Sequence, residues 1–223
     1  FSQCLELTSV TIDNSITSIG DSAFYNCTGL TEVTISDLSA WCKIDFGDDP
    51  SSNPLNYAGK LKLNGEEITN LVIPSDITEI KNYAFSGCTS LTSVTIPNSI
   101  TTIGDMAFCR CTGLTSAIIG NSVTTIGYGA FCGCSGLTEI NLPKSIISGG
   151  FGGNHEFSDC SNLLNITIDD ANAYFCSVDG VIYSEDKTKL VCYPPGRQGA
   201  YVIPETTTTV GKCAFYFCAG LTD

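Results

Sequence analysis

Positive charge is scarce in this chain. Of its 223 residues only 10 are Lys or Arg, against 23 Asp and Glu, which leaves a net charge of −13. The basic residues are scattered, so we expect no patch for nucleic-acid phosphates or for an anionic membrane surface. No apolar run approaches the ~20 residues that span a bilayer, so no membrane insertion of this segment is expected.

Residue types that often carry chemistry are also rare. The chain has one His, one Trp and one Met. No signal peptide is visible at its start. The sequence begins in the middle of a pattern at Phe1 and stops in the middle of one at Asp223, so we expect a segment of a longer protein.

A 23-residue repeat runs through most of the chain. The unit from Leu91 reads Leu-Thr-Ser-Val-Thr-Ile-Pro, then Ile-Thr-Thr-Ile-Gly, Ala-Phe and Cys. Anchored on the first Leu, the units start at Leu7, Leu30, Ile68, Leu91, Leu114, Leu137, Leu163, Gln198 and Leu221, with insertions of 15, 3 and 12 residues. A period of this length is typical of leucine-rich repeats, whose units stack to share one core.

Each unit has the pattern of one coil. Val94 and Ile96 alternate with Ser93 and Thr95, as in a strand with one buried face, and Pro97 ends that strand because it has no N–H to donate. The expected inward positions are Leu91, Val94, Ile96, Ile100, Ile103, Ala107, Phe108 and Cys111. We therefore expect a β-rich leucine-rich-repeat solenoid of stacked ~23-residue coils, with a parallel sheet and little α-helix.

Two insertions, at about 38–67 and 170–197, predict hairpins that leave the stack. In the first, Asn64-Gly65 favours a two-residue turn. In the second, the apolar stretches 178–183 and 190–193 flank a polar tip. We treat 1–223 as a single solenoid domain, truncated at both ends.

These motifs resemble the BspA-type leucine-rich-repeat proteins found on the surfaces of bacteria and some protists. The unit "LTSVTIPNSITTIGDMAFCRCTG" is similar to the family pattern, and "YFCSVDGVIYSEDKTKLVCYPPG" is similar to a recurring hairpin of the family. The resemblance covers nearly the whole chain. It implies an extracellular, surface-attached protein, often concerned with adhesion, but no particular ligand and no shared catalytic residues.

Thirteen cysteines raise the question of disulfides. Seven of them follow the phenylalanine position and predict an inward column of reduced thiols: Cys4, Cys27, Cys88, Cys111, Cys134, Cys160 and Cys218. Neighbours in such a column lie ~4.8 Å apart, whereas bridged Cβ atoms lie ~3.8 Å apart. Cys109 and Cys132 form a second pair one repeat apart. The remaining four, Cys42, Cys176, Cys192 and Cys213, are the better candidates for a bridge or a reactive thiol, and Cys176 and Cys192 are expected to face each other across the second hairpin.

No catalytic or metal site is predicted, and no cofactor. The Cys-x-Cys spacing at Cys109 and Cys132 is shorter than the usual zinc spacing. The only histidine, His155, follows a glycine-rich stretch, 149–154, that we interpret as a bulge between coils, and no cysteine is marked as its partner. Asp48-Asp49 and Asp169-Asp170 match no calcium loop and are interpreted as solvated charge.

The outward strand positions are mostly small hydroxyl residues. Threonine favours strands, so a purely structural role explains them as well as a binding platform does. The candidate ligand-binding residues on this face are Thr92, Ser93, Thr95, Thr115, Ser116, Thr138 and Glu139, and the outward positions Asn141, Asn165 and Thr167 follow them. The candidate aromatic anchors are Tyr183, Tyr193 and Tyr201 near the second insertion, and Trp41 in the first. Trp41 is equally suited to filling the core where the Ala-Phe pair is lost.

These observations lead to three hypotheses. The first is a monomeric cell-surface adhesion module that binds a protein or glycan on host or neighbouring cells. The second is a spacer that displays another domain. The third, an enzyme, lacks a supporting constellation in the sequence.

Overall fold

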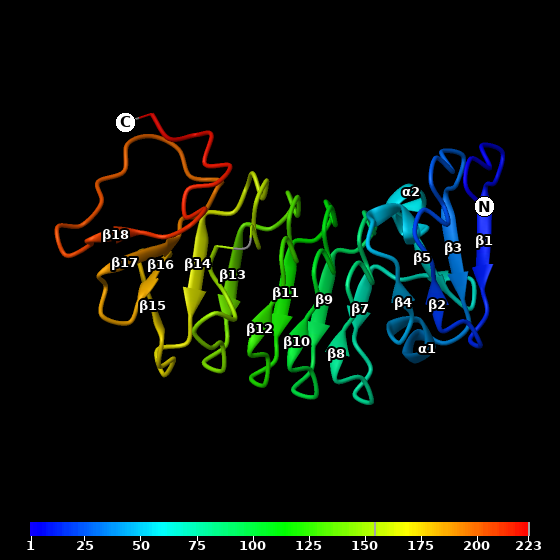
Figure 1. Ribbon diagram of the computed structural model, residues 1–223, viewed down its shortest axis with the longest axis horizontal. Coiled ribbons are helices and arrows are strands. Elements are labelled where there is room, and N and C mark those ends of the chain that lie inside the picture. The colour runs from blue at the N-terminus through cyan, green and yellow to red at the C-terminus, as the bar shows by residue number, and fades with distance from the viewer. Residues whose placement is uncertain (154, 223) are drawn as a thin grey trace.

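The computed structural model describes residues 1–153 and 155–222 as an elongated stack of coils (Figure 1). The expected solenoid is confirmed. In the unit that begins at Leu91, Val94 and Ile96 are each 1% exposed, while Thr95 between them faces outward and is half-buried. The alternation of one strand therefore decides which side faces the core.

One side of the stack carries the longer strands, here called the strand face. They are β1 (Ser9–Ile12), β3 (Glu32–Ile35), β5 (Leu61–Leu63), β7 (Asn70–Val72), β9 (Ser93–Ile96), β11 (Ser116–Ile119), β13 (Glu139–Leu142) and β14 (Asn165–Ile168). Neighbours pair in parallel one repeat apart, so Ser93 lies opposite Ser116.

The pairing on the strand face is not continuous. It is divided into three sheets, ordered β1-β3-β5-β6, β11-β9-β7 and β13-β14. One break follows the first insertion, and the other falls between β11 and β13, which are adjacent in Figure 1 without a pairing register. The second break shapes the candidate site.

Shorter strands line a second side of the coils. They are β2 (Ser18–Ile19), β4 (Asp45–Phe46), β8 (Glu79–Ile80), β10 (Thr102–Ile103) and β12 (Thr125–Ile126), and β18 (Thr209–Val210) lies near the far end. In the turns that close the coils, the rings of Phe85 and Phe108 stack at 5.4 Å and those of Phe108 and Phe131 at 5.3 Å. The Ala-Phe position thus builds a continuous aromatic column through the core.

The first insertion contributes more to the stack than a hairpin. The predicted hairpin is confirmed in β5 and β6 (Glu66–Glu67), with positive φ at Asn64 and Gly65. However, β5 also continues the main sheet beside β3, and β4 pairs with β2. The insertion also contains three short helical segments. The helix α1 (Leu38–Cys42) precedes β4, and the 3-10 turn η1 (Pro50–Ser52) and the helix α2 (Leu55–Ala58) lie between β4 and β5.

The second insertion forms an antiparallel sheet at the far end of the stack. Its strands are β15 (Phe175–Val178), β16 (Val181–Ser184) and β17 (Lys189–Cys192). The predicted hairpin with a polar tip is β16–β17. Because β16 lies between β15 and β17, Cys176 pairs with Tyr183 and not with Cys192. The prediction that Cys176 and Cys192 face each other is therefore wrong.

All thirteen cysteines are free, so the column is reduced, as predicted. Five of its members are buried, but Cys4 is exposed and Cys218 is half-buried, because both belong to the end coils.

None of the described helices is both long and apolar enough to cross a membrane.

Candidate functional site

Trp41 lies in the core and not on the surface. Its side chain is 1% exposed, and its indole N–H donates to the Ala84 carbonyl at 3.0 Å. The ring also contacts Phe46, at 5.4 Å between centroids. A ligand cannot reach this side chain, which corrects its assignment as an anchor; it fills the space where the first insertion lacks an Ala-Phe pair.

Two of the three candidate tyrosines are also buried. Tyr183 is 2% and Tyr193 4% exposed, in a second small core with Ala214. Tyr201 is half-buried; its ring lies 4.5 Å from that of Tyr193, and its hydroxyl hydrogen-bonds to that of Tyr183. Burial raises the pKa of the Tyr183 phenol. The tyrosines thus stabilise the second insertion, and only Tyr201 remains partly accessible.

Some of the predicted hydroxyl residues are used within the stack. The Thr92 hydroxyl donates to the Thr69 carbonyl and that of Thr115 to the Thr92 carbonyl, both at 3.0 Å. Ser93 donates to the Asn70 side chain at 2.7 Å, and Thr95 is half-buried on the same face. These bonds connect each coil to the preceding one, as the structural interpretation of the sequence predicts.

The threonine ladder stops where β11 meets β13. Among the described residues Thr138 donates no bond to the Thr115 carbonyl, although it stands one repeat after Thr115. Ala117 occupies the place that Val94 fills in β9. A missing ladder and a small side chain leave a depression of about 340 Å³, here called the strand-face groove.

The strand-face groove brings four predicted residues together: Thr115, Ser116, Thr138 and Glu139. Asn141, Asn165 and Thr167 also line this groove. The sequence predicts that they point outward but does not predict that they share a site. All seven side chains are exposed. The strand period predicts their outward direction, but only the break in the sheet turns that surface into a concave one.

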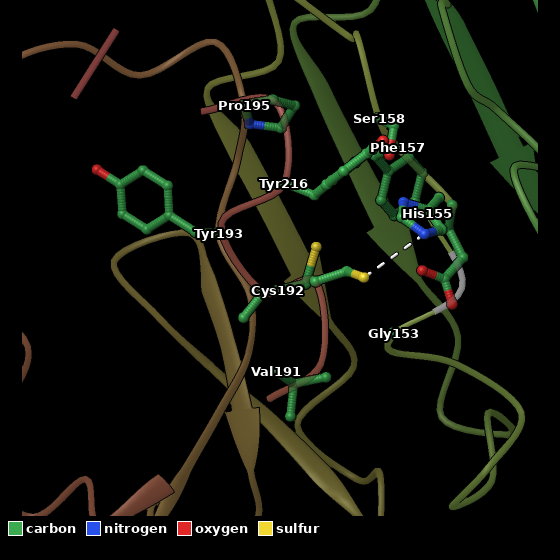
Figure 2. A pocket seen from close by; sticks show the side chains of 12 residues that line it. Gly153, His155, Phe157, Ser158, Val191, Cys192, Tyr193, Pro195 and Tyr216 are labelled. Atoms are coloured by element: carbon green, nitrogen blue, oxygen red, sulfur yellow. Dashed lines mark hydrogen bonds between the residues drawn. The ribbon is translucent and has the colours of Figure 1, made fainter. Parts of the chain in front are cut away.

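His155 has a partner that the sequence did not identify. Its Nε2 lies 3.5 Å from the Cys213 sulfur, in the small pocket shown in Figure 2. Tyr128 and Tyr216 contact the imidazole ring edge-to-face. The two residues are 58 apart in the sequence, and each directly precedes the Ala-Phe position of its coil, at Glu156-Phe157 and Ala214-Phe215.

This thiol–imidazole pair lacks the surroundings of a catalytic site. The pocket holds about 20 Å³, which accommodates one water. His155 Nδ1 is buried and has no hydrogen-bond partner among the described residues, so no third group orients the ring. Of the glycine-rich stretch before it, residue 154 lies outside the described residues. Within the described chain, no three His, Cys, Asp or Glu side chains are arranged to hold a metal ion.

A second groove, of about 640 Å³, lies on the side of the coils, and we call it the side groove. Tyr25 and Tyr57 line one end, and Met106, Cys109 and Cys132 line the other. The sequence does not predict it, because its walls come from the first insertion and from several coils.

A stack of 23-residue coils with inward columns of Leu, Ile, Phe and Cys defines a leucine-rich-repeat solenoid. The family model described as BspA type leucine rich repeat region matches residues 1–43 and 62–177, in six copies. The chain belongs to this family, as the resemblance in the sequence indicates. Leucine-rich-repeat proteins are generally non-catalytic binding modules, and nothing in the comparisons points to an enzyme.

Solved structures show the same fold. The pneumococcal vaccine antigen PcpA matches with a TM-score of 0.58 and 24% identity, over 96% of this chain and 54% of that one. A leucine rich cell surface protein from Faecalibacterium prausnitzii matches with a TM-score of 0.50 and 26% identity, over 97% and 60%. The T. pallidum leucine rich repeat protein matches with a TM-score of 0.51 and 21% identity, over 96% and 78%. The chain thus spans little more than half of the first two, and no curated protein matches it.

Proposed function

We propose that this chain is the recognition part of an extracellular, cell-surface protein, and that it binds a protein or glycan ligand in the strand-face groove. The observation that carries the proposal is the break between β11 and β13, which gathers exposed hydroxyl, amide and carboxylate groups in one depression. The family and the similarity to a protein described as a cell surface protein support the location.

The chemistry of the groove favours a polar ligand that carries hydrogen-bond donors. Glu139 forms no ion pair within the described chain, and the whole chain carries a net charge of −13. The Glu139 carboxylate accepts only, and the hydroxyls of Thr115, Ser116 and Thr138 both donate and accept. The amide oxygens of Asn141 and Asn165 already accept from Thr167 and Arg197. The chain acts as a monomer in this proposal, and no catalytic step is part of it.

The experiment is a binding screen of the purified chain against extracellular-matrix proteins and a glycan array. Ser116→Arg places a long side chain in the groove and is expected to weaken any binding roughly ten-fold or more, about 1.4 kcal/mol. The matched control is Ser9→Arg, which changes the equivalent exposed position on β1. Equal binding by both variants would contradict the assignment of the groove, and absence of saturable binding would contradict the function.

The alternative function is a spacer that displays another domain. The hydrogen bonds of Thr92 and Thr115 favour it, because these hydroxyls are already used to connect coils. Two results together would support the spacer. The folded chain would bind nothing in the screen, and cells would lose attachment only when the display distance is shortened.

A further inference from the structure

Cys109 and Cys132 form a thiol pair at one end of the side groove. They stand 23 residues apart, at equal positions in successive coils, and the Arg110 N–H donates to the Cys132 carbonyl at 2.6 Å across that step. Cys109 is 8% exposed, whereas Cys132 is half-buried and reaches the groove surface. Both residues thus line the groove, and the Cys132 thiol is the more accessible of the two.

A second cysteine pair with the same spacing provides an internal comparison. Cys111 and Cys134 are both 0% exposed. Their thiols donate to the carbonyls of Phe85 and Phe108, at 3.2 and 3.1 Å. Burial raises the pKa of each. Identical sequence spacing therefore produces two chemically different pairs, one closed within the core and one open to the groove.

The surroundings of the open pair favour a thiolate on Cys132. The interaction between the two thiols lowers the pKa of Cys132 to about 7 and, together with burial, raises that of Cys109. Burial and Asp159 on the following coil oppose this shift, while Arg110 on the preceding coil supports it. A cysteine with this pKa is ionised to a large extent at neutral pH, and the thiolate is the reactive form.

We infer that Cys109 and Cys132 are a dithiol–disulfide site that reacts with small anionic disulfides. The Cys132 thiolate attacks one sulfur of the disulfide, whose S–S bond breaks, and the released thiolate takes a proton from solvent. Cys109 then loses its proton and attacks the Cys132 sulfur, displacing the second thiolate, which is protonated in turn. Two electrons pass from the protein thiols to the small disulfide, which leaves as two thiols.

The geometry allows the intramolecular bond. Adjacent coils lie ~4.8 Å apart, within the ~4.4–6.8 Å that Cα atoms of a disulfide span, and a small backbone shift brings the Cβ atoms to the ~3.8 Å of a bridge. In the core column the thiols of Cys111 and Cys134 are held by carbonyls and enclosed by packing, whereas in the described chain no carbonyl holds the thiols of the open pair. Arg110 is exposed, lines the groove beside both sulfurs and forms no ion pair in the described part of the chain. It supplies the positive charge that favours a disulfide with carboxylate groups.

The test exposes the reduced protein to oxidised glutathione and locates the products by peptide mapping. We expect one Cys109–Cys132 cross-link and a mass loss of two hydrogen atoms, with Cys111 and Cys134 unmodified in the same sample. Cys109→Ala is expected to stop at a mixed disulfide on Cys132. It also removes the neighbouring thiol, so the pKa of Cys132 returns toward the ordinary ~8.5 and its labelling rate at pH 7 falls roughly ten-fold.

The class of disulfide is tested separately with Arg110→Gln. We expect this variant to slow the reaction with oxidised glutathione more than the reaction with cystamine, a cationic disulfide, because Arg110 attracts the anionic probe in addition to favouring the Cys132 thiolate. Equal slowing with both probes would overturn the role of Arg110. Uniform modification of all thirteen thiols, or a Cys109→Ala variant with the original labelling rate and pH profile, would overturn the site.

Discussion

The cysteines of the core column act as small apolar residues with one hydrogen bond to give. Cys160 is 0% exposed, and its thiol donates to the Phe131 carbonyl at 3.1 Å. The thiol therefore satisfies a carbonyl of the preceding coil while filling the volume beside the phenylalanine column. Burial also disfavours the thiolate, because it raises the pKa of Cys160. A reduced, unreactive column follows from these two effects together.

Phe108 lies in the middle of the phenylalanine column, so we expect its substitution to lower the free energy of unfolding strongly. Its ring stacks on both Phe85 and Phe131 and is 0% exposed. Phe108→Ala removes both contacts and leaves a cavity, so we expect the free energy of unfolding to fall by about 3–5 kcal/mol. Urea unfolding followed by circular dichroism measures it. Tyr174→Ala, at an exposed ring, is expected to change it by less than ~0.5 kcal/mol; similar losses in both would contradict the column.

At the scale of the elements, the geometry of a hairpin turn depends on adjacent residues, whereas the path of an insertion depends on distant ones. Asn64-Gly65 has positive φ at both positions, the geometry of the two-residue turn that this pair of residues predicts. Asp179-Gly180 adopts the same geometry and divides the stretch 178–183, predicted as one arm of the second hairpin, between β15 and β16. The path of the first insertion depends instead on contacts with coils far along the chain, such as that of Trp41 with Ala84.

Substitution of Gly65 tests the first turn. Its φ is +89°, and an added Cβ would meet nothing within 4 Å, so any cost is backbone strain and not a clash. Gly65→Ala is expected to lower the stability by about 1–2 kcal/mol, measured by thermal unfolding. Gly20→Ala is the control, because Gly20 has an equally open position without positive φ. A loss of stability in Gly20→Ala as large as in Gly65→Ala would contradict the explanation by backbone strain.

Asn53 anchors the first insertion in the structure. It is 0% exposed; its amide donates to the carbonyls of Tyr83 and Ala84 at 2.8 and 3.1 Å, and it accepts from the Leu55 N–H at 2.9 Å. Asn53→Ala leaves these buried groups without that partner, so a loss of about 1–3 kcal/mol is expected. Thermal unfolding is compared with that of Asn14→Ala, at an exposed position. An unchanged Asn53→Ala melting temperature would refute the anchoring role.

At the scale of the whole molecule, stability comes from contacts between neighbouring coils. Each strand of the central stack pairs only with the strands one repeat before and after it, as β9 does with β7 and β11. Such a molecule behaves as a one-dimensional array, whose stability is a sum over units and interfaces.

Removal of one whole repeat tests this property. Deletion of 93–115 removes 23 residues and joins Thr92 to Ser116, which restores the local sequence. We expect a folded, shorter solenoid with reduced stability, seen as a native-like circular dichroism spectrum and a lower melting temperature. Deletion of 93–112 removes 20 residues and shifts every inward column, so it is expected to prevent folding of the stack. Equal behaviour of the two deletions would contradict the coil register.

The sequence by itself determined the coil, its inward columns, the reduced state of the core thiols, the Asn64-Gly65 turn and the polar tip of the second hairpin. These features relate residues one repeat apart or adjacent in the chain, and a constant coil geometry turns such spacing directly into contact. The adjacency of Cys109 and Cys132 belongs to this group.

Only the tertiary structure decided which surfaces are open. The break between β11 and β13, the burial of Trp41, Tyr183 and Tyr193, and the approach of Cys213 to His155 were not predictable from the period. Each depends on where an insertion leaves the stack and on how side chains from distant coils fill the remaining volume. The repeat encodes relations within the stack, whereas grooves and exposed thiols arise where packing departs from it.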